Sequence, residues 1–149
     1  MKIFVGQIYI KAGVAFPFSL RFQKWLGDAL SERVAVSPEF SSEFGTGYGL
    51  GLRISAKDDI EQPEIKGPTV YKRDKTVEFT IFLPHRANDC YDPAVASPLV
   101  DQVLQSVVIV LNQIGLDAAT VLRDVEYLRS EFLSVPGLLD ARKRPTPDS

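Results

Sequence analysis

The first part of the chain alternates short apolar runs with polar breaks. Residues 2–10, KIFVGQIYI, are rich in β-branched and aromatic side chains and are apolar on both faces, a pattern typical of a buried central strand. After Pro17, which suits the first position of a helix, apolar residues recur at helical spacing through Leu30. Residues 33–40 are ambiguous, and one interpretation is a short strand followed by a turn at Pro38. The pattern therefore predicts a strand followed by a helix.

Two further strands and a loop are predicted in the middle of the chain. Residues 47–56 form a strand in which glycines recur on one face, whereas the polar, acidic stretch 57–68 holds two prolines and is typical of a loop. Residues 75–84, KTVEFTIFLP, place apolar side chains at alternate positions, and Pro84 ends the run. This alternation predicts a strand with one buried face.

The last part of the chain predicts two helices and a tail. Ser97 can cap the first helix, Pro98 fits its first position, and apolar residues recur along one stripe as far as Ile114. Asp117 can cap the second helix, whose apolar face continues to Phe132. The polar residues at the end show no apolar period, and we expect them to fray.

Together these segments predict one α+β domain. The expected order is β-α-β-β-α-α, with the domain in residues 1–137 and a polar, flexible tail in residues 138–149. We expect an antiparallel or mixed sheet with the helices packed mainly on one face, a variant of the ferredoxin-like arrangement. A chain of 149 residues buries roughly 70% of its unfolded surface, so one such core is feasible.

Four glycines at alternate positions, Gly45, Gly47, Gly49 and Gly51, raise the question of a nucleotide site. A dinucleotide fingerprint needs G-x-G-x-x-G at a strand-to-helix turn, and here the third glycine comes one position too early. A P-loop is excluded because no Gly-Lys-Ser or Gly-Lys-Thr follows. Alternate glycines instead leave one face of a strand without side chains, which allows close packing of another segment or leaves a groove for a ligand. Packing is the preferred interpretation, and the ligand groove stays open as the alternative.

Charge and cysteine content narrow the class of protein. The formal net charge is −2 and the pI about 5.4, which argues against a general electrostatic affinity for nucleic acid. Cys90 is the only cysteine, so no intramolecular disulfide can form, which suits a reducing compartment. The apolar run near the N-terminus contains Gln7 and Tyr9, and no run approaches membrane-spanning length. We expect a cytoplasmic protein with no membrane partner, with secretion as the minor alternative.

The candidate reactive residues are His85 and Cys90, the only histidine and cysteine, in the loop that follows residues 75–84. They could act as a thiol nucleophile and its base if their side chains came within hydrogen-bonding distance. The favoured interpretation is a structural loop whose Asp and Asn residues form turns. One histidine and one cysteine fall short of a zinc site, and no calcium-loop pattern occurs. We expect no metal, no cofactor and no catalytic residue; a non-enzymatic protein is favoured, and the enzyme question stays open.

An acidic cluster in the loop 57–68 is the main candidate for binding a partner. It consists of Asp58, Asp59, Glu61 and Glu64. Such a cluster is ordinarily a solvated loop, but it also suits the docking of a basic partner. Tyr48 and Tyr71 are candidate aromatic anchors. The basic stretches 71–75 and 142–144 are short and no RNP pattern of RNA-binding domains occurs, so a nucleic-acid partner is not expected.

The stretch KTVEFTIFLPH, residues 75–85, followed by the helix from Ser97 to Ile114, resembles the immunity proteins of bacterial polymorphic toxin and contact-dependent growth inhibition systems. The resemblance lies in the general plan of a small, acidic α+β chain, and it carries over no site residue. It implies a protein that neutralises a cognate toxin domain by tight stoichiometric binding. Many such toxins are nucleases with basic clefts, so the acidic cluster would steer association.

Two other functions are compatible with the sequence. One is a small-ligand-binding protein or enzyme that uses the groove beside the glycine strand together with His85 and Cys90. The other is a structural or regulatory subunit that dimerises through the two C-terminal helices, residues 97–132. Monomer and homodimer are therefore both open, and the partner expected first is a toxin domain.

Overall fold

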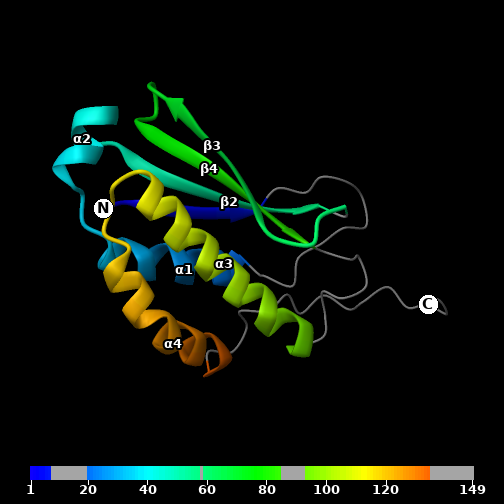
Figure 1. The fold of residues 1–149 in the computed structure, drawn as a ribbon. Helices are drawn as coiled ribbons and strands as arrows, with labels where there is room; N and C mark the ends of the chain where they lie inside the picture. The colour runs from blue at the N-terminus through cyan, green and yellow to red at the C-terminus, as the bar shows by residue number, and fades with distance from the viewer. Residues whose placement is uncertain (8–19, 58, 85–92, 135–149) are drawn as a thin grey trace.

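The computed structural model describes residues 1–7, 20–57, 59–84 and 93–134 of the chain. These residues form a four-stranded sheet and helices that lie mainly on one side of it (Figure 1). In chain order the elements are β1 (Ile3–Gln7), α1 (Leu20–Arg33), α2 (Pro38–Phe44), β2 (Gly49–Lys57), β3 (Glu64–Tyr71), β4 (Thr76–Pro84), α3 (Pro93–Gln113) and α4 (Ala119–Ser134). The predicted α+β class is confirmed.

The sheet is mixed and has the strand order β1-β2-β4-β3. β1 pairs with β2 and β2 pairs with β4 in parallel, whereas β3 pairs with β4 in antiparallel orientation. A mixed sheet is one of the two types that the sequence predicts. The ferredoxin-like variant is not confirmed, because β1 and β2 are direct parallel neighbours here, whereas the split β-α-β unit of that fold places another strand between them.

The predicted order β-α-β-β-α-α is wrong in two places, because it lacks α2 and β3. The stretch predicted as a loop, 57–68, includes the start of β3 at Glu64. β3 shows no apolar alternation because seven of its eight residues are exposed, and it accommodates Pro68 because it is an edge strand. At α2, Ser37 caps the helix by accepting a hydrogen bond from the backbone nitrogen of Phe40 at 3.1 Å, so the proposed turn at Pro38 is a helix start.

Two more elements differ from their predicted positions. β1 is the outermost strand of the described sheet and not a central one, and 52% of Phe4 is exposed. α3 begins at Pro93, so Pro98 lies inside the helix and not at its start; both prolines suit a first helical turn, and the earlier one is used. The predicted start of the first helix at Pro17 lies outside the described residues, within which α1 begins at Leu20.

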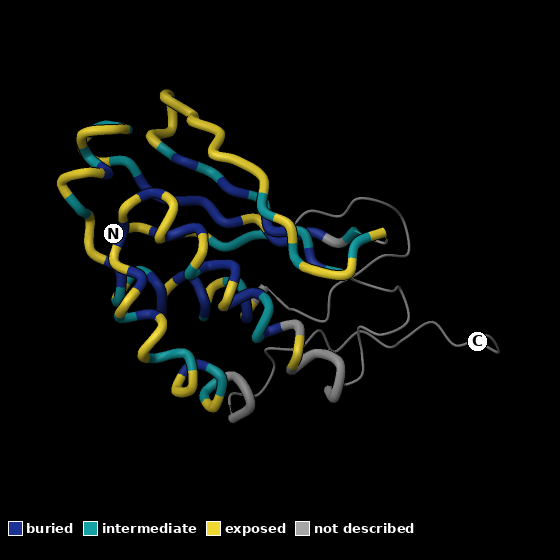
Figure 2. The backbone as a smooth tube through the Cα atoms, in the orientation of Figure 1, coloured by how far each residue is buried: buried dark blue, intermediate teal, exposed yellow. Residues whose placement is uncertain are grey.

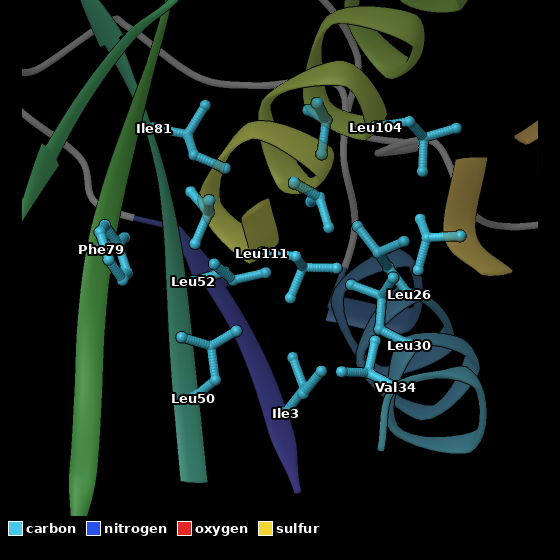
Figure 3. Close-up of a cluster of buried hydrophobic side chains, with 14 of the residues drawn as sticks. Ile3, Leu26, Leu30, Val34, Leu50, Leu52, Phe79, Ile81, Leu104 and Leu111 are labelled. Carbon is cyan, nitrogen blue, oxygen red and sulfur yellow. The ribbon is translucent and has the colours of Figure 1, made fainter. Parts of the chain in front are cut away.

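The hydrophobic core lies on one face of the sheet. Alternate residues of the two central strands point to it and are buried, namely Leu50, Leu52, Ile54, Val77, Phe79, Ile81 and Leu83. The helices α1 and α3 cover this face with their apolar stripes, as the close-up of the core shows (Figure 3). α4 packs against α1 and α3. The predicted packing of the helices mainly on one face is confirmed for the described helices.

Polar contacts join α1 to α4 beside the core. Trp25 Nε1 donates a hydrogen bond to Glu131 Oε1 at 2.8 Å, and Arg33 Nε lies 3.1 Å from Asp124 Oδ2. The second pair is largely shielded from solvent, since the side chains of Arg33 and Asp124 are 16% and 35% exposed. None of the described helices combines the length and the apolar character needed to cross a lipid bilayer.

The outer edge of β1 lies against α1. Ile3 N donates a hydrogen bond to Ser31 Oγ at 2.9 Å, and Ser31 Oγ donates to the carbonyl oxygen of Gly27 at 2.7 Å. A Cβ at Gly27 would lie 3.1 Å from the carbonyl oxygen of Ile3, so glycine allows the helix to approach the strand. The helix thereby occupies a backbone group that an added strand would need for pairing at this edge.

Candidate functional site

The side of the sheet opposite the core is not covered by any of the described helices (Figure 1). Residues paired in register share a face, so Phe4 of β1, Gly51 of β2 and Glu78 of β4 form one row across this side. Gly6 and Arg53 belong to the next row. Further along β2 on the same side Ser55 is buried, so the exposed part is the half nearest the turn between β3 and β4. We call this half the open face.

The open face is hollowed. A depression of about 430 Å³ lies over β1, β2 and β4 and reaches Tyr71 and Asp74 at the turn between β3 and β4. Its floor includes Gly51, and Phe4 and Gly6 lie on its β1 side. We call this depression the open-face hollow. Its volume lies within the range of pockets that bind small molecules or partner side chains.

The four alternating glycines lie in three different environments: the turn before β2, the contact with β1 and the open-face hollow. Gly45 and Gly47 have φ values of 117° and 83° and belong to the turn before β2, so the bald strip within the strand consists only of Gly49 and Gly51. A Cβ at Gly49 would lie 3.0 Å from the carbonyl oxygen of Lys2, which is the close packing preferred from the sequence. Gly51 instead lines the hollow, as the alternative interpretation expected. The packing interpretation therefore holds for Gly49, whereas a ligand groove at Gly51 stays a prediction.

An ion pair crosses the floor of the hollow. Arg53 Nε lies 2.9 Å from Glu78 Oε2, and the Glu78 side chain is only 17% exposed. A Cβ at Gly51 would lie 3.6 Å from Glu78 Cγ, so the glycine leaves space for the glutamate to lean across β2 towards Arg53. The arginine and the glutamate thus neutralise each other, while Asp74 adds an exposed carboxylate at the rim.

Two exposed aromatic residues flank the hollow. Phe4 on β1 is 52% exposed and Tyr71 at the end of β3 is 44% exposed. The ammonium group of Lys2 lies 4.8 Å from the centre of the Phe4 ring. Tyr71, which the sequence singles out as a candidate anchor, therefore lies at the site. Tyr48 does not lie there: its ring is partly buried against the core and beside Gly45.

The acidic cluster lies at the other end of the sheet. Asp59 and Glu61 are exposed in the loop before β3, and Glu64 opens β3. Glu64 Oε2 lies 3.1 Å from Lys57 Nζ, and this hydrogen bond and the charge of Glu64 raise the pKa of Lys57 above its ordinary value of 10.5. An eight-residue strand separates Glu64 from Tyr71 by about 20 Å, so the predicted acids and the predicted tyrosine are not brought together.

The remaining predicted site residues lie outside the described part of the chain. These are Asp58 of the acidic cluster and the pair His85 and Cys90. Among the residues that the structure describes, no group of three or more His, Cys, Asp or Glu side chains is placed to hold a metal ion.

Sequence reasoning missed most of the open-face hollow. The sequence pattern predicts that Phe4 lies in a buried strand, and it gives no indication that Arg53, Glu78 or Asp74 belongs to a site. One signal was present, because Phe4 and Gly6 alternate on one side of a strand just as Gly49 and Gly51 do. Only the pairing of β1 with β2 places these two pairs of alternating residues next to each other.

Comparison of the chain with protein-family models, with curated proteins and with solved structures gives no match.

Proposed function

We propose that this protein is a non-enzymatic binding protein, an immunity protein that neutralises a cognate bacterial toxin domain by tight stoichiometric binding. The observation that supports the binding role is the open face, where Phe4 and Tyr71 are exposed beside a hollow. Exposed aromatic side chains around a concave centre, with charged groups at the rim, are the composition of protein interfaces. The toxin as partner rests on the resemblance of residues 75–114 to immunity proteins, and the cytoplasm is the proposed place of action.

The acidic loop would serve association more than the final contact. Asp59 and Glu61 are exposed, whereas Glu64 is partly neutralised by Lys57 at 3.1 Å. Exposed charges far from the centre of an interface act mainly on the rate of association with a basic partner. In this proposal the toxin approaches under the attraction of the acidic loop and docks on the open face, which plugs its active site or blocks the path of its substrate.

The test is calorimetry with the C-terminal domain encoded by the gene directly upstream. We expect one-to-one binding with a nanomolar dissociation constant and loss of the toxin's activity in the complex. Absence of binding would contradict the immunity function.

A second experiment tests the role of the acidic loop. Changing Asp59→Lys and Glu61→Lys together should lower the association rate constant about tenfold at low salt and flatten its salt dependence. The control is Glu32→Lys with Glu126→Lys, which changes the net charge equally but on exposed positions of α1 and α4. If the loop and helix variants slow association equally, the loop has no steering role.

A second candidate function is the binding of a small molecule in the open-face hollow. The observation that favours it is the hollow's volume of about 430 Å³, which matches small-molecule sites. A thermal-shift screen of metabolites tests it, and alkylation of Cys90 tests whether this thiol is reactive. A thiol with ordinary, slow labelling at neutral pH would count against an enzyme of the Cys-His type.

A further inference from the structure

The end of the open face beside the turn between β3 and β4 is basic, although the chain as a whole has a formal net charge of −2. Four exposed cations lie there: Lys2, Lys72, Arg73 and Lys75. None of the four makes an ion pair with a described residue, and Lys2 instead lies over the Phe4 ring, 4.8 Å from its centre. We call these four residues the basic turn end.

Two segments far apart in the sequence contribute to the basic turn end. The backbone nitrogen of Gly49 donates a hydrogen bond to the carbonyl oxygen of Lys75 at 2.8 Å, and that of Leu50 donates to the carbonyl oxygen of Lys2 at 3.0 Å. The start of β2 therefore lies between Lys2 and Lys75, whose backbones are roughly 10 Å apart at about 4.8 Å per strand. The cluster is thus larger than the basic run in the turn, because the strand order adds Lys2 to it.

Few carboxylates offset this positive charge. Glu78 is already paired with Arg53 at 2.9 Å, and Asp74 is the only acid among residues 72–75. The acids of α2, which leads into β2 at this end of the sheet, are Glu39 and Glu43, and neither makes an ion pair with the basic turn end. Exposed like charges without counter-charges repel one another, so an anionic partner would relieve the repulsion.

Lys75 occupies a position at which the backbone favours glycine. Its φ is 49°, in the left-handed region that costs conformational energy for a residue with a Cβ. Glycine would relieve that cost and remove the charge at the same time. Because the ammonium group of Lys75 makes no ion pair with a described residue, a role in binding can be separated from a role in stability here.

The arrangement of the cations favours a protein surface with carboxylates over a single small anion. All four side chains of the basic turn end are exposed, so they do not enclose one ion. Phe4 and Tyr71, which are 52% and 44% exposed, lie beside them. Exposed aromatic residues within a charged rim are typical of protein interfaces, in which charge complementarity sets the partner and its orientation.

The acidic loop lies at the other end of the same sheet. Asp59 and Glu61 are exposed there, about 20 Å from the basic turn end along β3. An interface of standard size buries about 800 Å² per partner, a patch roughly 30 Å across, so one partner would cover both ends. Such a partner meets charges of opposite sign at the two ends of the open face.

We propose that the toxin domain presents a surface of two signs to the open face, with carboxylates against the basic turn end and basic groups against the acidic loop. This inference rests on the proposed immunity function, for which it names the chemistry of the contact surface and the orientation in which the toxin docks. A toxin rotated by half a turn on the face would place like charges together, which lowers the affinity of that orientation.

Carbodiimide cross-linking of the complex with the toxin domain is the first test, because it joins a lysine amine to a carboxylate only where the two are in contact. We expect mass spectrometry to find links from Lys72 or Lys75 to Asp or Glu residues of the toxin domain, and from the acidic loop to its lysines. Lys24, exposed on α1 on the helix side of the sheet, is the control and should give no such link. Links from the acidic loop alone, or equal links from Lys24, would overturn the inference while the immunity function stands.

Charge reversal measures how much the cations contribute to affinity. Lys72→Glu with Arg73→Glu should weaken the complex about tenfold or more, because each new carboxylate faces a carboxylate of the partner. The matched control, Lys24→Glu with Arg123→Glu, changes the net charge equally on exposed positions of α1 and α4 and should leave the affinity within about twofold. Equal affinities of these two variants would overturn the inference.

Lys75→Gly gives a readout that a merely structural role would not move. We expect its melting temperature to rise, because the left-handed backbone is relieved, and its affinity for the toxin domain to fall about threefold or more, because a charge is lost. An affinity equal to that of the wild type would contradict the inference.

A titration without the toxin separates this inference from the immunity function. Polyglutamate is the probe, followed by ¹H–¹⁵N NMR, and we expect shifts centred on residues 72–75, with none at Lys24 or Arg123. Such shifts without any binding of the toxin domain would overturn the immunity function and leave the anionic specificity of the basic turn end. Shifts spread equally over the basic residues of the chain would overturn the inference, and so would tighter binding of single-stranded oligothymidylate, which would assign the turn to nucleic acid.

Discussion

Gly49 and Gly51 lie two residues apart on the same side of β2, yet they have different neighbours. A Cβ at Gly49 would lie 3.0 Å from the backbone oxygen of Lys2, which is tighter than nine in ten real Cβ contacts, so the neighbouring strand would have to shift by a few tenths of an ångström. A Cβ at Gly51 would meet Thr76 Cγ2 at 3.4 Å and Glu78 Cγ at 3.6 Å, which is van der Waals contact with side chains. One glycine serves packing of the backbone, and the other keeps the hollow open.

Alanine at the two positions should therefore have opposite effects on stability. We expect Gly49→Ala to lower the free energy of unfolding by about 1–3 kcal/mol, because β1 must move away from β2. Gly51→Ala should leave it unchanged or raise it by up to about 1 kcal/mol, because alanine reduces the freedom of the unfolded chain without a clash. Urea denaturation of both variants measures this, and equal destabilisation would contradict the assignment of Gly51 to the hollow.

At the scale of single elements, hydrogen-bonding side chains define where helices begin. Asp117 caps α4: its Oδ1 accepts hydrogen bonds from the backbone nitrogens of Ala119 at 3.1 Å and Thr120 at 3.4 Å, and its Oδ2 accepts one from Thr120 Oγ1 at 2.8 Å. The predicted cap is thus confirmed. These hydrogen bonds to Thr120 are the main reason that the pKa of Asp117 lies below its ordinary value of 3.8.

The cap makes the stability of the protein depend on pH. Because the pKa of Asp117 is lower in the folded than in the unfolded chain, its contribution is fully present above the ordinary value of 3.8 and is lost as the pH falls through the folded-state pKa. We expect Asp117→Asn, which keeps an acceptor oxygen but does not titrate, to be less stable than wild type at pH 6. The difference between the two urea midpoints should shrink by pH 2.5. A difference that is the same at both pH values would show that ionisation of Asp117 plays no part.

At the scale of the whole molecule, the two faces of the sheet are unequal. The core positions of β2 and β4 are buried, whereas β3 is exposed along most of its length (Figure 2). Phe79 and Phe4 represent the two faces, since Phe79 is 0% and Phe4 is 52% exposed. The same type of residue, phenylalanine, is part of the core on one face of the sheet and part of the candidate binding surface on the other.

Truncation of these two phenylalanines should separate stability from binding. Phe79→Ala should lower the free energy of unfolding by about 3–5 kcal/mol, because it leaves a cavity in the core. Phe4→Ala should cost no more than about 1 kcal/mol, because about half of the side chain is already in water. Thermal or urea denaturation compares the two variants. A large loss of stability in Phe4→Ala would mean that the open face belongs to the core of the fold.

Much of the fold could be predicted from the sequence because local patterns report local environments. The alternation in residues 75–84 identified β4 and its buried face, and the apolar stripes identified α3 and α4. β3 was missed because an exposed strand that contains Gly67 and Pro68 has no such pattern. Of the candidate site, only Tyr71 and the glycine strip were selected, since Phe4, Glu78 and Asp74 carry no local mark of a binding residue.

By itself the sequence determined the α+β class, the buried face of β4, the apolar stripes of α3 and α4, and the Asp117 cap, because each depends on residues close together in the chain. The tertiary structure alone decided the strand order, the outer position of β1 and the meeting of Phe4, Gly51 and Tyr71. The physical reason is that apolar periodicity specifies which side of a strand is buried but not which strand becomes its neighbour. Pairing between distant segments sets that, and the open-face hollow exists only because β1 pairs with β2 and β4 returns between β2 and β3.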